Sequence, residues 1–373
     1  PFVYGGDANG GIVARDLDIV KGLVSRKAET GYPQRFFTNY TKGVGHRFRV
    51  FEMVKILSDA DMCKGATLSF QSLSEAALEN VQRDNIRLDV YADLQRMYTE
   101  AGIFSYHEMI LGLPGETLDS FCAGLDTLID AGASTGLFVY LCRVLPNTEM
   151  ADPEYLKKHG ITTRRMPIQS SHANLVQADV GPPEYEDTII STTTLPLEDW
   201  MTAVEVAWFI QAFLCLGLAR YPLLWLKDRG VSVTTFARWA LVEMRDATDG
   251  AGDPVYQSLR NEALRIDEYI ERLTTGSQDY HFAERATFGA IRWPIEEASF
   301  LALSLDRDRY FDELNKLFRR FLTDKCYSSE GLENAIERNK RELIHWGDGD
   351  PAVFAREKVW WNRRGGSFLK GAT

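Results

Sequence analysis

The alternation of short apolar runs with helical periodicity between residues 2 and 143 is the feature that most constrains the fold. Each of five apolar runs ends in a polar or turn-rich segment, and apolar residues at helical spacing follow. This order favours βα units and a mainly parallel sheet. The predicted strands cover residues 2–4, 35–39, 66–70, 103–111 and 137–142.

The pattern changes after about residue 150. A polar stretch containing Pro153, Pro167 and Pro182 predicts a linker or an irregular crossing segment over residues 151–195. We therefore predict an α/β part over residues 1–150, this linker, and a mostly α-helical C-terminal domain over residues 196–373. The expected helices lie near residues 198–226, 234–247, 254–275, 296–323 and 330–346.

Charge and hydropathy limit the partners. The chain has 42 Lys and Arg against 53 Asp and Glu, a net charge of -11 without a basic stripe, which argues against a nucleic-acid partner. The most apolar run, residues 206–219, is shorter than the roughly 18 residues of a membrane span, so we predict a buried helix there. Its aromatic side chains, among them Trp208 and Phe213, could line a pocket, but core packing is the better interpretation.

The cysteines predict neither a disulfide framework nor a metal motif. They are odd in number and at least 20 residues apart, which suits a reducing, cytoplasmic setting. They are Cys63, Cys122, Cys142, Cys215 and Cys326. The six histidines are also scattered without metal-ligand spacing, so we expect ordinary surface or core positions for them.

Polar residues gather where the predicted strands end. Ligands of parallel sheets and barrels collect at the C-terminal ends of strands, because the loops there vary freely and helix N-termini point their amides at the site. Asp7 and Ser72 could equally be plain helix caps. The clusters are Asp7 with Asn9, Asn39 with Tyr40, Gln71 with Ser72, and residues 112–116.

The sequence Gly-Leu-Pro-Gly-Glu at residues 112–116 is the most specific of these clusters. Two glycines around a proline, after an apolar strand, predict a tight and preset loop. The loop has neither the three glycines of a dinucleotide fingerprint nor the Lys-Ser/Thr pair of a phosphate-binding Walker loop. The sequence also offers no Ser, His and acid trio for nucleophilic catalysis.

Taken in order, the motifs resemble the barrel of radical S-adenosylmethionine (SAM) enzymes, and most closely the subgroup with a cobalamin (B12)-binding domain. The resemblance covers residues 1 to about 200. It rests on Asp-Ala-Asn-Gly-Gly-Ile at residues 7–12 with Arg15 and Asp16, Leu-Ser-Phe-Gln-Ser at 68–72 running to Gln-Arg-Asp-Asn at 82–85, and Met-Ile-Leu-Gly-Leu-Pro-Gly-Glu-Thr at 109–117.

The resemblance implies a SAM site. Asp7 and Asn9 match the loop that holds the SAM amino group. Gln71 and Ser72 match the polar group that meets the ribose or carboxylate, and Arg83 matches the arginine that pairs with the carboxylate.

The same resemblance implies the adenine and substrate contacts. Ile110 matches the apolar residue against adenine, while Gly112 and Glu116 shape the loop and Leu145 completes the adenine site. We also expect Tyr40, Tyr140 and Arg143 to lie where a substrate is met; packing or solvated positions are the alternative for each.

The chain departs from the family in one motif. The CxxxCxxC loop that ligates the [4Fe-4S] cluster is absent, and no three of the cysteines have that spacing. The resemblance therefore predicts a C-terminal fragment, a partial (βα) TIM-like barrel without its first strand, that is inactive alone. A barrel that has lost its cluster is the less economical alternative.

The implied activity belongs to the intact protein. With SAM, a [4Fe-4S] cluster and possibly cobalamin, it would generate a 5'-deoxyadenosyl radical or transfer a methyl group, using an external electron donor. Net acidity favours a small-molecule, lipid or peptide substrate over RNA. The alternative is a non-catalytic SAM-binding or protein-interaction module. A conventional barrel lyase or hydrolase would need an acid/base constellation that the sequence does not offer.

Overall fold

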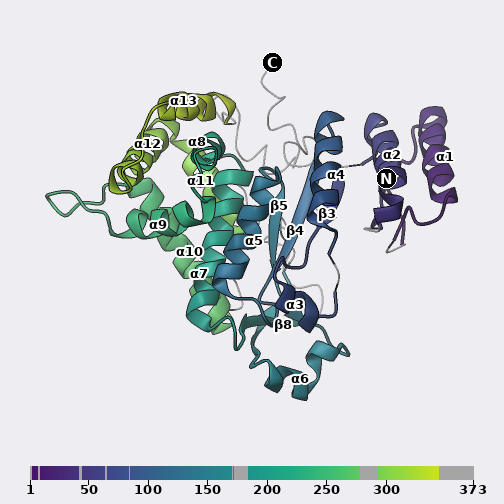
Figure 1. Ribbon diagram of the computed structural model, residues 1–373, viewed down its shortest axis with the longest axis horizontal. Helices are drawn as coiled ribbons and strands as arrows, with labels where there is room; N and C mark the ends of the chain where they lie inside the picture. The colour runs from purple at the N-terminus through teal and green to yellow at the C-terminus, as the bar shows by residue number, and fades with distance from the viewer. Residues whose placement is uncertain are drawn as a thin grey trace.

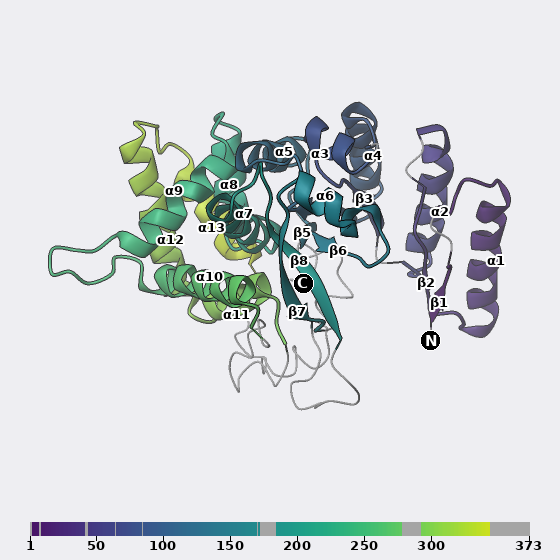
Figure 2. The same ribbon diagram turned by 90° about the horizontal axis from the view of Figure 1, so that it is seen from below.

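The computed structural model describes residues 2–6, 9–41, 44–63, 65–83, 85–169, 171, 184–277 and 292–343. The chain is an α/β protein, as predicted. Parallel strands lie between a helical block formed by α7 to α13 and a smaller unit that contains α1 and α2 (Figures 1 and 2).

The small unit is built from the first two βα repeats. Its two strands pair in parallel, with Phe2 opposite Arg35. Val20, Phe36 and Leu57 form part of a local core between strands and helices. The elements are β1 (Phe2–Tyr4), α1 (Arg15–Thr30), β2 (Arg35–Phe37), the 3-10 turn η1 (Val44–His46) and α2 (Arg47–Asp59).

The central sheet carries the next three predicted strands. Its order is β3-β4-β5, and both pairs are parallel. Side chains of β4 alternate strictly, so His107, Met109 and Leu111 are buried while the residues between them are half-buried. The elements are β3 (Ala66–Ser69), α3 (Glu75–Asn80), α4 (Leu88–Glu100), β4 (Ser105–Leu111), α5 (Leu118–Asp130) and β5 (Leu137–Leu141).

The parallel pairing confirms the predicted βα arrangement. The strands of the predicted partial barrel, however, do not form one continuous sheet. Among the described residues β1 and β2 form one sheet and β3, β4 and β5 another, without strand pairing between β2 and β3. The strands predicted over residues 35–39 and 103–111 are also shorter in the structure, where they cover Arg35–Phe37 and Ser105–Leu111.

Residues 151–195, predicted as a linker, contain regular structure. A third sheet of order β6-β8-β7 is antiparallel, and α6 begins at Pro153 with Asp152 as its N-cap. The prolines obscured short strands whose inward side chains, such as Met166 and Ile189, are buried. The elements are β6 (Arg143–Val144), the 3-10 turn η2 (Glu149–Ala151), α6 (Pro153–Lys158), β7 (Thr162–Pro167) and β8 (Tyr185–Ser191).

The C-terminal half is helical, as predicted, with two of the predicted helices divided. The helix predicted over residues 198–226 breaks at Gly217, whose φ is +94°, and that predicted over 296–323 breaks at Asp306, which caps α12. The elements are α7 (Leu197–Phe209), the π-helix η3 (Ile210–Cys215), α8 (Arg220–Lys227), α9 (Val233–Asp246), α10 (Gln257–Thr275), α11 (Ile295–Leu305), α12 (Arg307–Asp324) and α13 (Leu332–Glu342).

None of the described helices is by itself long and apolar enough to cross a bilayer. Residues Leu197–Cys215 reach the required length and hydropathy only together with Arg220–Lys227, across a bend of 106°. Phe209 and Phe213 in this stretch stack at 4.3 Å inside the core, which confirms their predicted packing role.

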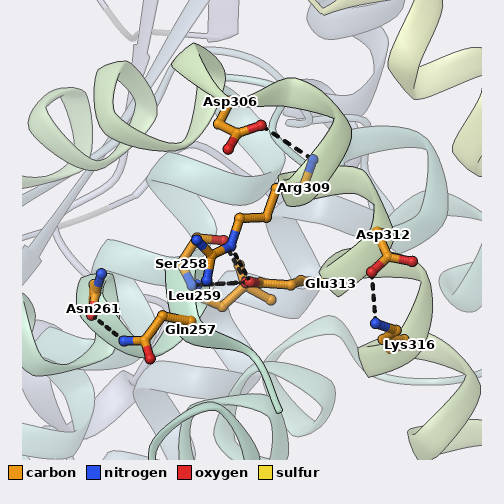
Figure 3. A network of polar contacts seen from close by, with 9 residues as sticks. All are labelled: Gln257, Ser258, Leu259, Asn261, Asp306, Arg309, Asp312, Glu313 and Lys316. Carbon is orange, nitrogen blue, oxygen red and sulfur yellow. Dashed lines mark hydrogen bonds and ion pairs between the residues drawn. The ribbon is translucent and has the colours of Figure 1, made fainter. Parts of the chain in front are cut away.

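Carboxylate side chains fix helix ends across the fold. Glu313 of α12 accepts hydrogen bonds from the backbone N–H groups of Ser258 and Leu259 at the start of α10, and Arg309 donates to the same carboxylate (Figure 3). Asp126 of α5 likewise accepts from the N–H of Thr234 at the start of α9. Asp126 thereby ties the strand-bearing half to the helical half.

Candidate ligand site at the strand ends

A cavity of about 660 Å³ lies beyond the C-terminal ends of β4 and β5, and we name it the strand-end cavity. The volume is within the usual range for small-molecule and cofactor sites. It is lined by Gln71, Asn80, Val81, Arg83, Ile110, Leu113, Tyr140, Leu141, Cys142, Arg143, Leu145, Thr148, Glu149, Met150 and Tyr155.

The loop at residues 112–116 forms one wall and is held against α3. Gly112 and Gly115 have φ values of +103° and +94°, which side-chain-bearing residues rarely adopt. A Cβ on Gly115 would lie 2.6 Å from Asn80 Nδ2 and 2.8 Å from the Ala76 carbonyl oxygen. Asn80 donates to the Pro114 carbonyl oxygen at 3.1 Å. Glycine is therefore required at residue 115 for close packing of the loop on α3.

Ser72 and Glu116 brace this wall from behind. The hydroxyl of Ser72 donates to the carboxylate of Glu116, which also accepts from Ser120, and both Ser72 and Glu116 are fully buried. Burial raises the pKa of the Glu116 carboxyl, and the hydrogen bonds from Ser120 and Ser72 oppose that shift. The cap of α3 is Ser74 rather than Ser72, because the Ser74 side chain accepts from the N–H of Ala77.

The structure brings many of the predicted ligand-binding residues together. Gln71, Arg83, Ile110 and Leu145 all line the strand-end cavity, although they come from four separate segments of the chain. Arg83 is exposed, and no ion pair joins it to another described residue. The predicted substrate residues Tyr140 and Arg143 line the same cavity, and Arg143 is bonded to Glu186 at 2.9 Å.

Other predicted residues lie elsewhere. Asn9 is exposed beside the bridge between Gly10 and Tyr40 in the small unit, and it does not line the strand-end cavity. Tyr40 instead lines a cavity of about 30 Å³ against β3 and α4, where burial raises the pKa of its phenol. Asp7 lies outside the described residues.

The sequence analysis missed the far wall of the cavity. Thr148, Glu149, Met150 and Tyr155 belong to η2 and α6, within or just before the segment predicted as a linker. The Tyr155 hydroxyl donates to the Asn80 carbonyl oxygen at 2.8 Å, so this wall is attached to α3. The available signal was Asp152 followed by Pro153, a typical helix start.

The described residues contain no group of three His, Cys, Asp or Glu side chains that could hold a metal ion. Burial also favours the protonated form of most of the thiols. It raises the pKa of Cys63, Cys122 and Cys215 to about 11 and that of Cys142 to about 12. Within the described ranges the cysteines therefore do not gather into the three-thiolate set that a [4Fe-4S] cluster needs.

Two curated proteins are similar to this chain, whereas no family model matches it. The cobalamin-dependent radical SAM methyltransferase TokK of Streptomyces tokunonensis is 34% identical over 329 residues, 83% of this chain and 46% of that protein. The 2-(S-pantetheinyl)-carbapenam-3-carboxylate methyltransferase of Streptantibioticus cattleyicolor is 30% identical over 361 residues, 93% of this chain and 51% of that protein. The chain spans about half the length of these relatives.

Solved structures of the radical SAM methyltransferase TsrM from Kitasatospora setae are more distant. The form with tryptophan and a SAM analogue has a TM-score of 0.39 at 15% identity, covering 57% of this chain and 44% of that one. The form with cobalamin and a [4Fe-4S] cluster has the same TM-score at 16% identity, covering 56% and 42%.

The sequence matches identify the group to which the chain is related. The chain is related in sequence to cobalamin-dependent radical SAM methyltransferases. This confirms the resemblance drawn from the three sequence motifs.

Proposed function

We propose that this chain is the SAM-binding and substrate-facing part of a cobalamin-dependent radical SAM methyltransferase that acts on a small molecule. The observation that carries the proposal is the convergence of Gln71, Arg83, Ile110 and Leu145 on one cavity at the strand ends. The two methyltransferase relatives support the same activity.

The chemistry of the cavity wall suits SAM. The Arg83 guanidinium can form paired hydrogen bonds with the methionyl carboxylate, and the Gln71 amide can bond the ribose or the same carboxylate. Ile110, Leu113 and Leu145 offer an apolar surface to the adenine ring. The braced loop at residues 112–116 keeps that surface in place.

The remaining cofactors are proposed for the whole protein. When bound, SAM, a [4Fe-4S] cluster and cobalamin supply the methyl group and the radical chemistry, and the cluster requires an external electron donor. Because the cysteines of this chain do not fit a cluster, we assign its ligands to the part of the whole protein outside these 373 residues. The role of this chain is to bind, orient and enclose SAM and the methyl acceptor.

Binding of S-adenosylhomocysteine tests the site. Arg83→Gln should weaken binding about 10- to 100-fold, because a charge-assisted hydrogen bond contributes about 1.5–3 kcal/mol. Arg87→Gln is the matched control, since Arg87 is exposed, pairs with Asp89 and does not line the cavity. Titration calorimetry measures both variants, and equal affinity of the two would reject this site.

Catalysis is tested in the full-length protein under anaerobic conditions with reconstituted iron, sulfide and cobalamin. Reductant-dependent formation of S-adenosylhomocysteine and 5'-deoxyadenosine is the expected result. SAM binding without either product would instead support the non-catalytic SAM-binding module.

A further inference from the structure

A second cavity, of about 370 Å³, adjoins the strand-end cavity, and we name it the acceptor cavity. It lies among β5, β8, α7, η3 and α11, and Tyr140, Leu141 and Arg143 line both cavities. The two cavities therefore share part of their walls. The position of the acceptor cavity suits the molecule that receives a group from SAM.

Gln211 is a polar side chain in the most apolar run of the sequence, and it lines the acceptor cavity. It lies in the π-helix η3, where the Leu216 N–H donates to the Gln211 carbonyl oxygen at 2.9 Å. π-Helical turns occur often at functional sites, because the additional residue in the turn redirects side chains.

The structure fixes the orientation of the Gln211 amide. β5 is the outer strand of its sheet, so one of its edges needs partners from elsewhere. The Val139 N–H donates to Gln211 Oε1 at 3.1 Å, and a flipped amide would set two donors against each other. Gln211 Nε2 has no hydrogen-bond partner in the described ranges. Its N–H groups are therefore available to a ligand in the cavity.

The other walls indicate what kind of ligand fits. Phe138, Trp208 and Leu273 provide aromatic and aliphatic surface. The Arg143 cation is already bonded to Glu186. Burial, followed by the negative charges of Glu108 and Glu296, raises the pKa of the Tyr140 phenol. The field at Tyr140 thus disfavours an anion, which leaves a neutral hydrogen-bond acceptor as the matching group.

We propose that Gln211 is a specificity-determining residue that donates a hydrogen bond to a neutral amide carbonyl of the methyl acceptor in the acceptor cavity. The inference rests on the proposed function and adds to it the residue and the chemical class of the acceptor. A site with a fixed donor discriminates strongly against a ligand that cannot accept from it.

Pantetheine, a neutral diamide, is the probe, and pantothenate, its carboxylate counterpart, is the comparison ligand. Saturation-transfer NMR titration of the full-length protein measures both dissociation constants. Pantetheine should bind, and pantothenate should bind about tenfold more weakly. Failure of pantetheine to bind would overturn the assignment of a neutral amide. Equal affinity for pantothenate, which keeps one of the two amides, would overturn the expected discrimination against an anion.

Variants test Gln211 itself. Gln211→Glu keeps an acceptor for the Val139 N–H and removes the donor, so pantetheine should bind about tenfold more weakly. Gln211→Met, a neutral side chain of similar length, should weaken binding to a similar extent, whereas the exposed Gln34→Glu should not. Unchanged pantetheine affinity in a folded Gln211→Glu or Gln211→Met protein would overturn the proposal.

Affinity for S-adenosylhomocysteine separates this proposal from the proposed function. It should be unaffected in the Gln211 variants, because Gln211 does not line the strand-end cavity. Loss of pantetheine binding with retained S-adenosylhomocysteine binding supports the role of Gln211. Wild-type protein that binds pantetheine but not S-adenosylhomocysteine would refute the SAM site without refuting the acceptor cavity.

Discussion

Gly115→Ala should destabilise the protein by about 4 kcal/mol. A left-handed backbone costs an alanine about 1–2 kcal/mol, and Gly115 has a φ of +94°. The new Cβ would also lie 2.8 Å from the Ala76 carbonyl oxygen, a backbone atom that cannot move without α3. Overpacking of this kind costs about 1–3 kcal/mol, and loss of the bond between Asn80 and Pro114 adds about 1 kcal/mol.

Gly252→Ala isolates the backbone cost. Gly252 has a φ of +87°, and no atom lies within 4 Å of the position its Cβ would take. Urea unfolding followed by circular dichroism should therefore show a loss of about 1–2 kcal/mol for this control. The difference of about 2–3 kcal/mol between the two variants is the combined cost of the steric contact with α3 and the lost bond between Asn80 and Pro114.

The same substitution should impair the ligand site. Asn80 is the last residue of α3 and Val81 and Arg83 follow it, and all three line the strand-end cavity, so displacement of α3 moves that wall. We expect Gly115→Ala to bind S-adenosylhomocysteine at least about tenfold more weakly by calorimetry, a loss of about 1.4 kcal/mol. A Gly115→Ala protein as stable as Gly252→Ala, with unchanged affinity, would refute the reasoning.

Two further predictions concern stability. Asp126 accepts hydrogen bonds from Ser232 Oγ and Thr234 Oγ1, both at 2.6 Å, and from the Thr234 N–H. Asp126→Ala should therefore lower the free energy of unfolding in urea by about 3 kcal/mol. An unchanged unfolding midpoint would contradict its capping role. Burial lowers the pKa of His107 from 6.5 to about 4, and the Tyr91 hydroxyl lies 2.8 Å from its Nδ1. The folded state favours the neutral ring, so neutral His107 contributes to the free energy of unfolding. This contribution is complete above pH 6.5 and decreases by about 3 kcal/mol as the pH falls toward 4. Unfolding free energies measured across this range should decrease less steeply for His107→Gln, and parallel curves would exclude His107 as the source.

The sequence predicted the elements that depend on local pattern. The strands and the glycines at residues 112 and 115 were found because periodicity and backbone restriction act within a few residues. The linker prediction failed over β7 and β8, because short strands between prolines gain their stability from pairing with each other. Tyr40 and Tyr140 were predicted together, yet only the packing of Tyr40 and α2 against β3 and α4 shows that Tyr40 lies in a separate cavity.

By itself the sequence determined the α/β class, the helical second half and the relationship to radical SAM enzymes, since each depends on periodicity or motifs within short, contiguous segments. Only the tertiary structure decided which residues share a cavity. The bond between Val139 and Gln211 joins residues 72 positions apart, and the bond between Asp126 and the Thr234 N–H spans 108 positions. Such contacts arise when the open edge of a sheet or the start of a helix finds its polar partner across the folded core, a match that no local pattern encodes.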